Sequence, residues 1–210
     1  MRVAELWRYP VKSLRGERLE RASVLLGGIA GDRLVRLEDE RGLVTARRKQ
    51  RLVGVDAVVG RDGEPWIEGE PWRSPAAGAR IRELAGAEAR LVPTGAGARF
   101  DGAPILVCTN GALAALGEDR RRFRPNVVIG GVPGLAEREW VGRELAIGGA
   151  VLAARELCVR CGVTTIDPDT VEVRPEVLRR VNDRFGGAMG LYCEVRRPGT
   201  IAVGDEVVIA

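Results

Sequence analysis

The stretch LCVRCGVTTIDPDT, residues 157–170, places Cys158 and Cys161 three positions apart. Hydroxyl and carboxylate side chains follow the pair closely: Thr164, Thr165, Asp167 and Asp169. The preceding residues 147–157 are rich in Val, Leu and Ala and short enough to form a buried strand. We therefore expect the cysteines where a strand ends and a loop begins, because a rigid element there aims reactive groups and the loop exposes them.

The residue types alone leave three interpretations of this cysteine pair open. Two thiolates are half of a four-ligand structural zinc site, but Cys108 and Cys193 stand singly and the chain has no histidine. A thioredoxin-type redox pair normally opens a helix, whereas Pro168 disfavours a helical residue before it. Free cysteines are also commonly small buried apolar residues, and the apolar runs around Cys108 and Cys193 fit that interpretation.

Short apolar segments separated by turn residues predict a mainly β chain. The predicted strands are residues 3–9, 19–26, 33–38, 43–47, 53–59, 65–67, 105–108, 127–129, 145–147, 151–157, 191–195 and 201–209. Two short helices are predicted, one capped by Thr109 or Asn110 and running to Leu116, the other from Pro175 to Val181. This pattern excludes a helical bundle and a doubly wound sheet, and it predicts a β-barrel architecture with a few short helices.

Length and composition favour a soluble enzyme. The 210 residues can bury one large core or two small ones, and the Gly- and Ala-rich residues 84–97 predict a boundary between domains at 1–93 and 94–210. No apolar run approaches the roughly 20 residues of a membrane helix, and no leader is present, so we expect a cytoplasmic protein without membrane association. The net charge of +4 comes from scattered arginines, so no nucleic-acid partner is expected.

The absence of histidine excludes several mechanisms. Ser-His-Asp and Cys-His arrangements are impossible within this chain. It has no Gly-x-x-x-x-Gly-Lys loop, and the glycines of residues 27–31 lack the spacing of a dinucleotide fingerprint. Its chemistry must therefore use cysteine, carboxylate, arginine or a bound cofactor.

Lys12 and Ser13 follow the predicted strand that ends at Pro10. An ammonium group, a hydroxyl and free backbone amides at a strand end are suited to holding a phosphate or another anion. A solvated surface turn has the same composition, so the residues alone leave both interpretations open.

Six blocks of sequence, in the same order, resemble one known family. They are WRYPVKS at residues 7–13, GDR at 31–33, VTAR at 44–47, FRPNV at 123–127, CGVTTIDPDT at 161–170, and PGTI with VGD within 198–205. Together they are similar to the MOSC domain family, named from the C-terminal part of molybdenum cofactor sulfurase. The resemblance is greatest to the branch that includes the mitochondrial amidoxime reducing component and its bacterial relatives. It implies a β-rich N-terminal domain packed with a MOSC β-barrel.

The resemblance also implies a molybdenum cofactor, molybdopterin, and an activity independent of pyridoxal phosphate. It makes Cys161 the catalytic residue and the molybdenum ligand, and Cys158 a supporting or structural residue. Thr109 and Asn110 fall where related proteins use a Ser-Glu pair, so their roles stay open. The remaining residues that it assigns to the phosphate and to the amide-like edge of the pterin are Lys12, Ser13, Arg33, Arg124 and Asn126.

Three hypotheses about function follow. The first is an oxidoreductase that reduces N-hydroxylated compounds such as amidoximes, hydroxylamines and N-hydroxylated bases, using the two-electron chemistry of the metal. Its electrons would come from a separate protein, because the chain has no ferredoxin-like cysteine cluster and no flavin or haem motif. The second is a cofactor or sulfur carrier that uses Cys161. The third, a thiol switch through Cys158 and Cys161, does not explain the anion-binding blocks, and the first is favoured.

Overall fold

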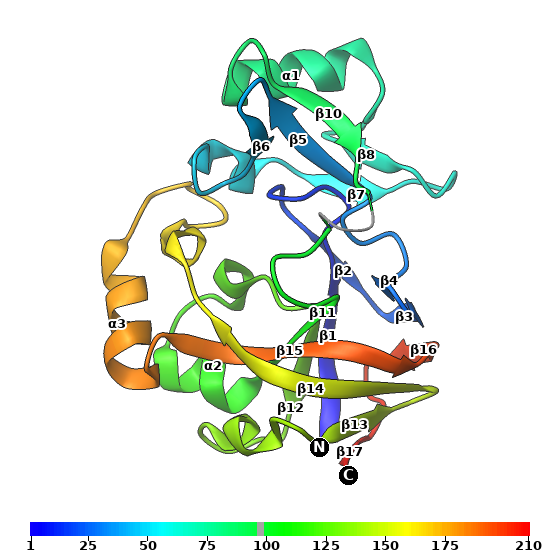
Figure 1. The fold of residues 1–210 in the computed structure, drawn as a ribbon, viewed down its shortest axis with the longest axis vertical. Coiled ribbons are helices and arrows are strands. Elements are labelled where there is room, and N and C mark those ends of the chain that lie inside the picture. Colours follow the sequence, from blue (N-terminus) through cyan, green and yellow to red (C-terminus); the bar gives the residue numbers. More distant parts are fainter. Residues whose placement is uncertain (96–98) are drawn as a thin grey trace.

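The computed structural model describes residues 1–95 and 99–210 and is organised around one eight-stranded sheet (Figure 1). Its neighbouring strands pair antiparallel, except for the parallel pair β11–β12. The strand order is β17 (Val207–Ile209), β13 (Glu144–Ile147), β14 (Ala150–Val159), β15 (Ala188–Arg197), β11 (Ile105–Thr109), β12 (Val127–Gly130), β1 (Arg2–Arg8) and β2 (Glu17–Leu19).

Three smaller sheets, each of three strands, complete the described β structure. They are β10 (Arg90–Pro93), β5 (Val35–Asp39) and β6 (Gly42–Val44); β16 (Gly199–Ala202), β3 (Arg21–Leu25) and β4 (Gly28–Ile29); and β7 (Ala57–Val59), β8 (Pro65–Ile67) and β9 (Glu70–Pro71). The helices are α1 (Pro75–Ala85), α2 (Asn110–Leu116) and α3 (Pro175–Phe185), with short 3-10 turns η1 (Gln50–Gly54), η3 (Arg120–Phe123), η4 (Ala136–Trp140) and η5 (Gly162–Thr165). The prediction of a mainly β chain with a few short helices is confirmed.

The apolar cores do not follow the order of the sequence. Val3 and Leu6 of β1 pack in one core with Ile105 of β11 and with other residues as far along the chain as Val207. A second core is formed within residues 11–89, between the β5–β6–β10 sheet and α1. The start of the chain therefore packs with the large sheet, and the predicted domain boundary after residue 93 stays a prediction.

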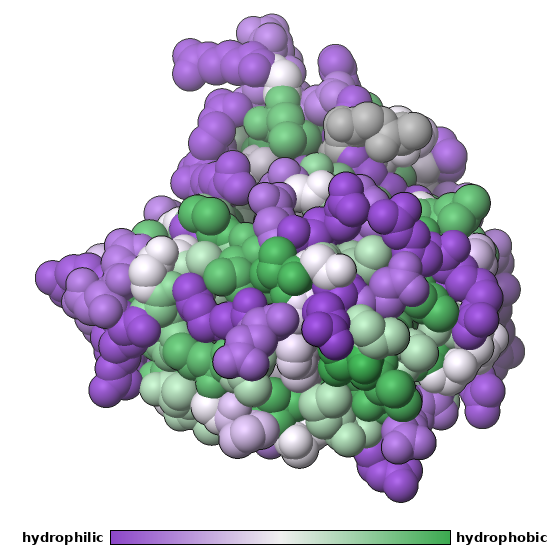
Figure 2. Space-filling model, turned by 60° about the horizontal axis from the view of Figure 1, so that its bottom comes forward, coloured by the Kyte–Doolittle hydropathy of each residue, from purple (hydrophilic) through white to green (hydrophobic). Residues whose placement is uncertain are grey.

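The elements that surround the two cores lie one above the other in Figure 1, with α1, β5, β6 and β10 at the top and both termini at the bottom. Helices α2 and α3 lie beside the large sheet, where Leu113, Val177 and Val181 pack with its residues. In the view of Figure 2, apolar residues are concentrated on the lower part of the molecule and hydrophilic side chains cover most of the upper part. Among the described helices, none has the length and apolar character needed to cross a membrane.

Both predicted helices are present, and their ends follow the predicted capping. The Thr109 hydroxyl accepts a hydrogen bond from the backbone N–H of Ala112, and Gly117 ends α2 in the left-handed conformation. Helix α3 begins at Pro175, as predicted, but continues to Phe185. Buried Val181 and Phe185 lie one turn apart on its inner face, so packing extends the helix beyond the predicted end.

Helix α1 was not among the predicted helices. Its sequence PAAGARIRELA contains Ala and Gly at positions that give only a weak amphipathic pattern. Two local signals were nevertheless present, since the Ser74 hydroxyl accepts from the backbone N–H of Ala77 and proline occupies the first turn. The helix is stabilised by burying Ile81 and Leu84 against the small sheet, a tertiary contact that the local sequence does not reveal.

Four predicted strands are wrong in extent. Residues 201–209 form β16 and β17 instead of one strand, because the Asp205 carboxylate accepts from the backbone N–H of Ala202 at 2.8 Å and closes a turn. Residues 53–59 begin inside η1, and residues 19–26 are divided between β2 and β3. A similar change occurs at residues 43–47, where β6 ends at Val44 and a turn follows, with the backbone N–H of Arg48 donating to the carbonyl of Thr45.

Thr109 has a structural role, which predicts a large effect of its removal. Its hydroxyl caps α2 and donates to the buried Glu137 carboxylate at 3.0 Å. Thr109→Val keeps the side-chain shape but removes both bonds, so we expect the free energy of unfolding to fall by about 2–3 kcal/mol in urea denaturation. Ser74→Ala removes only the α1 cap and should cost about 1 kcal/mol. Equal losses for the two variants would contradict the role of the Thr109–Glu137 bond.

Candidate functional site

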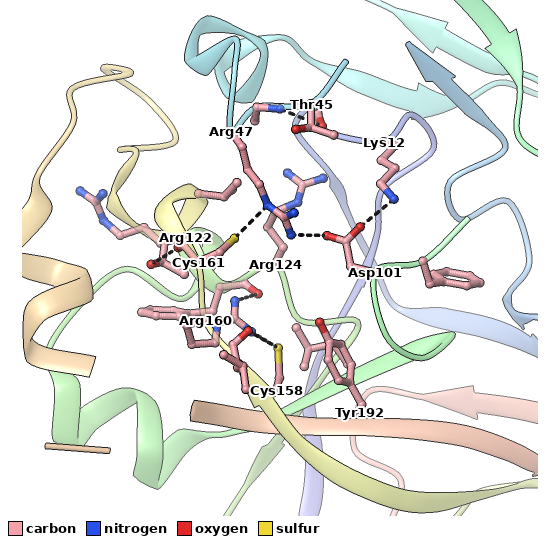
Figure 3. A pocket seen from close by; sticks show the side chains of 18 of the residues that line it. Lys12, Thr45, Arg47, Asp101, Arg122, Arg124, Cys158, Arg160, Cys161 and Tyr192 are labelled. Carbon is pink, nitrogen blue, oxygen red and sulfur yellow. Dashed lines mark hydrogen bonds and ion pairs between the residues drawn. The ribbon is translucent and has the colours of Figure 1, made fainter. Parts of the chain in front are cut away.

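A cavity of about 120 Å³ lies where the small β5–β6–β10 sheet meets the large sheet (Figure 3). Its walls come from the turns after β1 and β6, the segment before β11, the residues after η3, and the end of β14 with η5. Among its described lining residues, Asp101 is the only carboxylate. The structure brings every predicted site residue to this cavity: Lys12, Ser13, Arg33, Arg124, Asn126 and Cys161.

Cys161 lies just beyond the end of β14, as predicted, and directly precedes η5. It is half-buried, whereas Cys158 on β14 is buried. The threonines that follow form the turn, since the Thr164 hydroxyl donates to the carbonyl of Cys161 at 2.9 Å and the Thr165 hydroxyl to the carbonyl of Gly162 at 2.7 Å. The Cys161 thiol is therefore held at the cavity by a rigid turn.

Arg47, Asp101 and Lys12 form a chain of charged contacts that ends at the Cys161 sulfur (Figure 3). Arg47 Nε donates to Cys161 Sγ at 3.4 Å, and Arg47 Nη2 lies 2.9 Å from Asp101 Oδ2. The second oxygen of Asp101 lies 2.8 Å from Lys12 Nζ. The hydrogen bond to Cys161 raises the pKa of Arg47. Burial alone would raise the pKa of Asp101, but the hydrogen bond and charge of Lys12 outweigh it and lower that pKa.

Arg124 is a buried cation of the cavity with no counter-ion among the described residues. Its guanidinium lies 4.2 Å above the ring of Tyr9, and its Nη2 is buried without a hydrogen-bond partner. No ion pair to Arg124 is present in the part of the chain that the structure describes. Burial lowers the pKa of Arg124 to about 10, which still leaves the group charged at neutral pH. A buried cation with an unused donor is suited to receive an anion.

Arg33 and Asn126 are both held by Asp32, a fully buried carboxylate. One Asp32 oxygen accepts from the backbone N–H of Tyr9 at 2.7 Å; the other contacts Arg33 Nη1 and accepts from Asn126 Nδ2 at 3.3 Å. The Asn126 side chain also accepts from the backbone N–H of Leu106 at 3.1 Å. These bonds tie the amide of Asn126 to the protein, so its predicted contact with a pterin stays a prediction.

Backbone strain is concentrated at the same cavity. Of the five non-glycine residues with positive φ in the described chain, Ser13, Arg33 and Arg124 line it, with φ of 77°, 49° and 54°. The Ser13 hydroxyl accepts from the backbone N–H of Ala46 at 3.1 Å, which joins the turns after β1 and β6. Such conformations persist only where surrounding contacts impose them, and they cluster at functional sites.

The other cysteines differ from Cys161 in their surroundings. Cys158 Sγ accepts from Arg160 Nη1 at 2.9 Å, and Tyr192 contacts the same thiol. The role of Cys158 as a supporting or structural residue stays a prediction. Cys108 and Cys193 are buried as predicted, and burial raises the pKa of each thiol to about 12. Within residues 1–95 and 99–210, no cluster of three metal-ligating side chains is present.

The two carboxylates of the cysteine motif lie outside the cavity lining. Asp167 accepts from the backbone N–H groups of Asp169 and Thr170, each at 3.0 Å, and pairs with Arg122 at 2.7 Å. Asp169 pairs with Arg121 at 2.6 Å. Both therefore fix the loop that follows η5.

Several cavity residues had no predicted role, among them Arg47, Asp101, Arg160 and Tyr192. Arg47 ends the VTAR block and Arg160 lies between the two cysteines of the 157–170 stretch, so their positions in these motifs could have indicated a role at the site. Asp101 and Tyr192 carry no such signal, because Asp101 belongs to an irregular segment and Tyr192 to a long strand of the large sheet.

These features define a mainly β protein. Between its β5–β6–β10 sheet and its large sheet lies a cationic cavity that contains a half-buried thiol. The MOSC domain matches residues 108–208, and the MOSC N-terminal beta barrel domain matches residues 1–68. The chain belongs to the MOSC family.

Individual relatives support this assignment. The chain is 28% identical to human mitochondrial amidoxime-reducing component 1, over 99% of this chain and 82% of that protein. It is 33% identical to the molybdenum cofactor sulfurase of Bombyx mori, over 40% of this chain and 10% of that protein. The crystal structure of the YUAD protein from Bacillus subtilis has the same fold, with a TM-score of 0.51 at 16% identity over 99% of this chain and 94% of that one.

Because Asp32 organises the cavity, its replacement should destabilise the protein. Asp32→Asn leaves Arg33 with an uncompensated buried charge, so we expect the free energy of unfolding to fall by about 3 kcal/mol in urea denaturation. Asp56→Asn is the control, because the Asp56 side chain is 64% exposed and pairs with Arg15 at the surface. The control should lose less than about 1 kcal/mol. A small loss for Asp32→Asn would contradict the organising role.

Proposed function

We propose that this protein is a molybdenum-cofactor-dependent oxidoreductase that reduces N-hydroxylated compounds, such as amidoximes, hydroxylamines and N-hydroxylated bases. The MOSC family and the amidoxime-reducing name of a relative that matches nearly the whole chain support the class of reaction. The observation that carries the proposal is Arg124, a buried cation with an unused donor in the same cavity as the Cys161 thiol.

The donor set fits an anionic cofactor that brings most of its own metal ligands. Arg124, Lys12, Ser13 and Arg33 would hold the phosphate of the pterin, because they offer cationic and hydroxyl groups within one cavity. Cys161 would supply the thiolate ligand to molybdenum. The described chain offers no cluster of three metal-ligating side chains, so the remaining metal ligands would have to come from the pterin sulfurs.

The cofactor supplies two-electron chemistry when bound, and the protein supplies position, charge and shape. Phe100, Phe123 and Leu106 line the cavity and would limit the access of water to the ligand. Tyr192 faces the same cavity. The pKa of its hydroxyl is raised, mainly by burial and to a smaller extent by the contact with Cys158. Its hydroxyl therefore keeps its proton at neutral pH and can donate a hydrogen bond to a bound substrate.

Electrons would reach the cofactor from a separate electron-transfer protein, because the sequence contains no recognisable second redox centre. The proposed partners are therefore a small N-hydroxylated substrate and a donor protein, with no nucleic acid. The cytoplasmic location stays a prediction.

A cofactor or sulfur carrier is the second candidate. The half-buried Cys161 favours it, because a thiol at the cavity rim can exchange its ligand with another protein. A carrier would release the cofactor readily and would not turn over any N-hydroxylated compound. Retention of the cofactor during turnover therefore distinguishes the two functions.

Cys161→Ser should abolish reduction while the fold survives. A serine hydroxyl is a much poorer ligand for molybdenum than a thiolate, so we expect activity with benzamidoxime and a chemical reductant to fall at least about 100-fold. Cys158→Ser is the matched control and should keep its bound molybdenum. Full activity of Cys161→Ser, with an unchanged urea midpoint, would contradict the ligand assignment.

Arg124→Met should weaken cofactor retention without destabilising the protein. The substitution removes a buried charge that has no counter-ion, so the free energy of unfolding should change by less than about 1 kcal/mol. Bound pterin after gel filtration should fall about tenfold. Arg120→Met is the control, since Arg120 begins η3, which Arg124 directly follows, but pairs with Glu5 outside the cavity. Full pterin occupancy in Arg124→Met would refute the phosphate role.

A further inference from the structure

Arg47 differs from the other cavity cations in its exposure. The side chains of Lys12, Arg33 and Arg122 are 10%, 15% and 1% exposed, whereas that of Arg47 is 52% exposed. The buried cations can reach a ligand only in the depth of the cavity. Arg47 instead meets a molecule that approaches from solvent.

The guanidinium of Arg47 is held in place by the contacts on two of its nitrogens (Figure 3). Nε donates to Cys161 Sγ and Nη2 to Asp101 Oδ2. No hydrogen bond to a described residue engages Nη1. The planar group is therefore fixed beside the sulfur with donor capacity left for a further partner, and an arginine fork is well suited to a carboxylate.

The backbone that carries Arg47 is also anchored. Ala46 is buried, and its backbone N–H donates to the Ser13 hydroxyl. The next turn of chain is closed by the backbone N–H of Arg48, which donates to the carbonyl of Thr45 at 2.9 Å. Arg47 thus projects from a fixed turn, which makes its position suitable for selecting a ligand.

The local charge favours an anion despite Asp101. One carboxylate contacts both Lys12 and Arg47, so the group of three side chains keeps an excess positive charge. Beside them, Val159 is 75% exposed and also lines the cavity, which provides an apolar surface for the carbon skeleton of a ligand.

We propose that Arg47 is a specificity-determining residue that recruits small molecules bearing a carboxylate, or a similar anionic oxygen, to the sulfur of Cys161. For the substrate, this inference rests on the proposed function and narrows it to N-hydroxylated compounds that also carry an anionic group. The recruitment of an anion to the Cys161 sulfur does not depend on that function and rests only on the geometry of Arg47 and Cys161.

The test is the alkylation of Cys161 by two reagents of similar shape in protein without cofactor. Iodoacetate carries a carboxylate and iodoacetamide is neutral; with each, the sulfur forms a bond to carbon and iodide leaves. The ratio of the two rate constants cancels changes in the reactivity of the thiol itself. It therefore measures the attraction of the carboxylate. Peptide mass mapping and Cys161→Ser confirm the labelled residue, since the other three cysteines are buried.

Arg47→Ala should lower the iodoacetate-to-iodoacetamide ratio about tenfold, and Arg47→Lys should lower it by less. Arg48→Ala is the matched control. It removes the same charge from the same turn, but Arg48 pairs with Asp39 and does not line the cavity. The ratio for Arg48→Ala should stay within about twofold of the wild-type value. A ratio for Arg47→Ala within twofold of the wild type, or an equal fall for Arg48→Ala, would overturn the inference.

A second measurement uses the cofactor-loaded protein with a chemical reductant. Arg47→Ala should raise KM for 4-carboxybenzamidoxime about tenfold and KM for benzamidoxime less than about threefold, with little change in kcat. An equal rise in both values would overturn the substrate preference. Absence of turnover by the wild-type protein would contradict the proposed function alone, because the alkylation ratio tests Arg47 without any reaction of the cofactor.

Discussion

The fully buried carboxylate of Asp32 joins the parts of the chain that form the cavity. It accepts from the backbone N–H of Tyr9 at the end of β1, contacts the guanidinium of Arg33, and accepts from Asn126 beside β12. Removing a carboxylate from water is costly unless its oxygens are paired, so these partners must stay together for the fold to be stable. The close approach of the N-terminal turn and the large sheet follows from this requirement.

The cavity that results has more positive charge than the protein neutralises. Asp32 compensates Arg33, and Asp101 is shared between Lys12 and Arg47. Arg124 has no counter-ion among the described residues; its guanidinium stacks on the ring of Tyr9 and its Nη2 has no hydrogen-bond partner. Burying a cation without a counter-ion is costly, and the strained backbone of Arg124 adds to that cost. We interpret this excess as the part of the site that an anionic ligand completes.

The sequence predicted the β-rich class, the α2 cap at Thr109 and the start of α3, because capping residues and alternation act locally. It missed α1, whose helix is stabilised mainly by burying Ile81 and Leu84. The family resemblance supplied the site residues as separate blocks of sequence, and the fold brings these blocks together in one cavity. Asp101 could not be found in this way, since it meets Arg47 across 54 positions from an irregular segment.

We propose that the cavity around Arg124 and Cys161 binds a molybdenum cofactor. The most direct measurement is the molar content of molybdenum and of released pterin in protein purified from a host that makes the cofactor. If the cofactor is bound, both should be present in nearly equal amounts, approaching one of each per chain. Absence of both, in a host whose other molybdoenzyme is fully loaded, would contradict it.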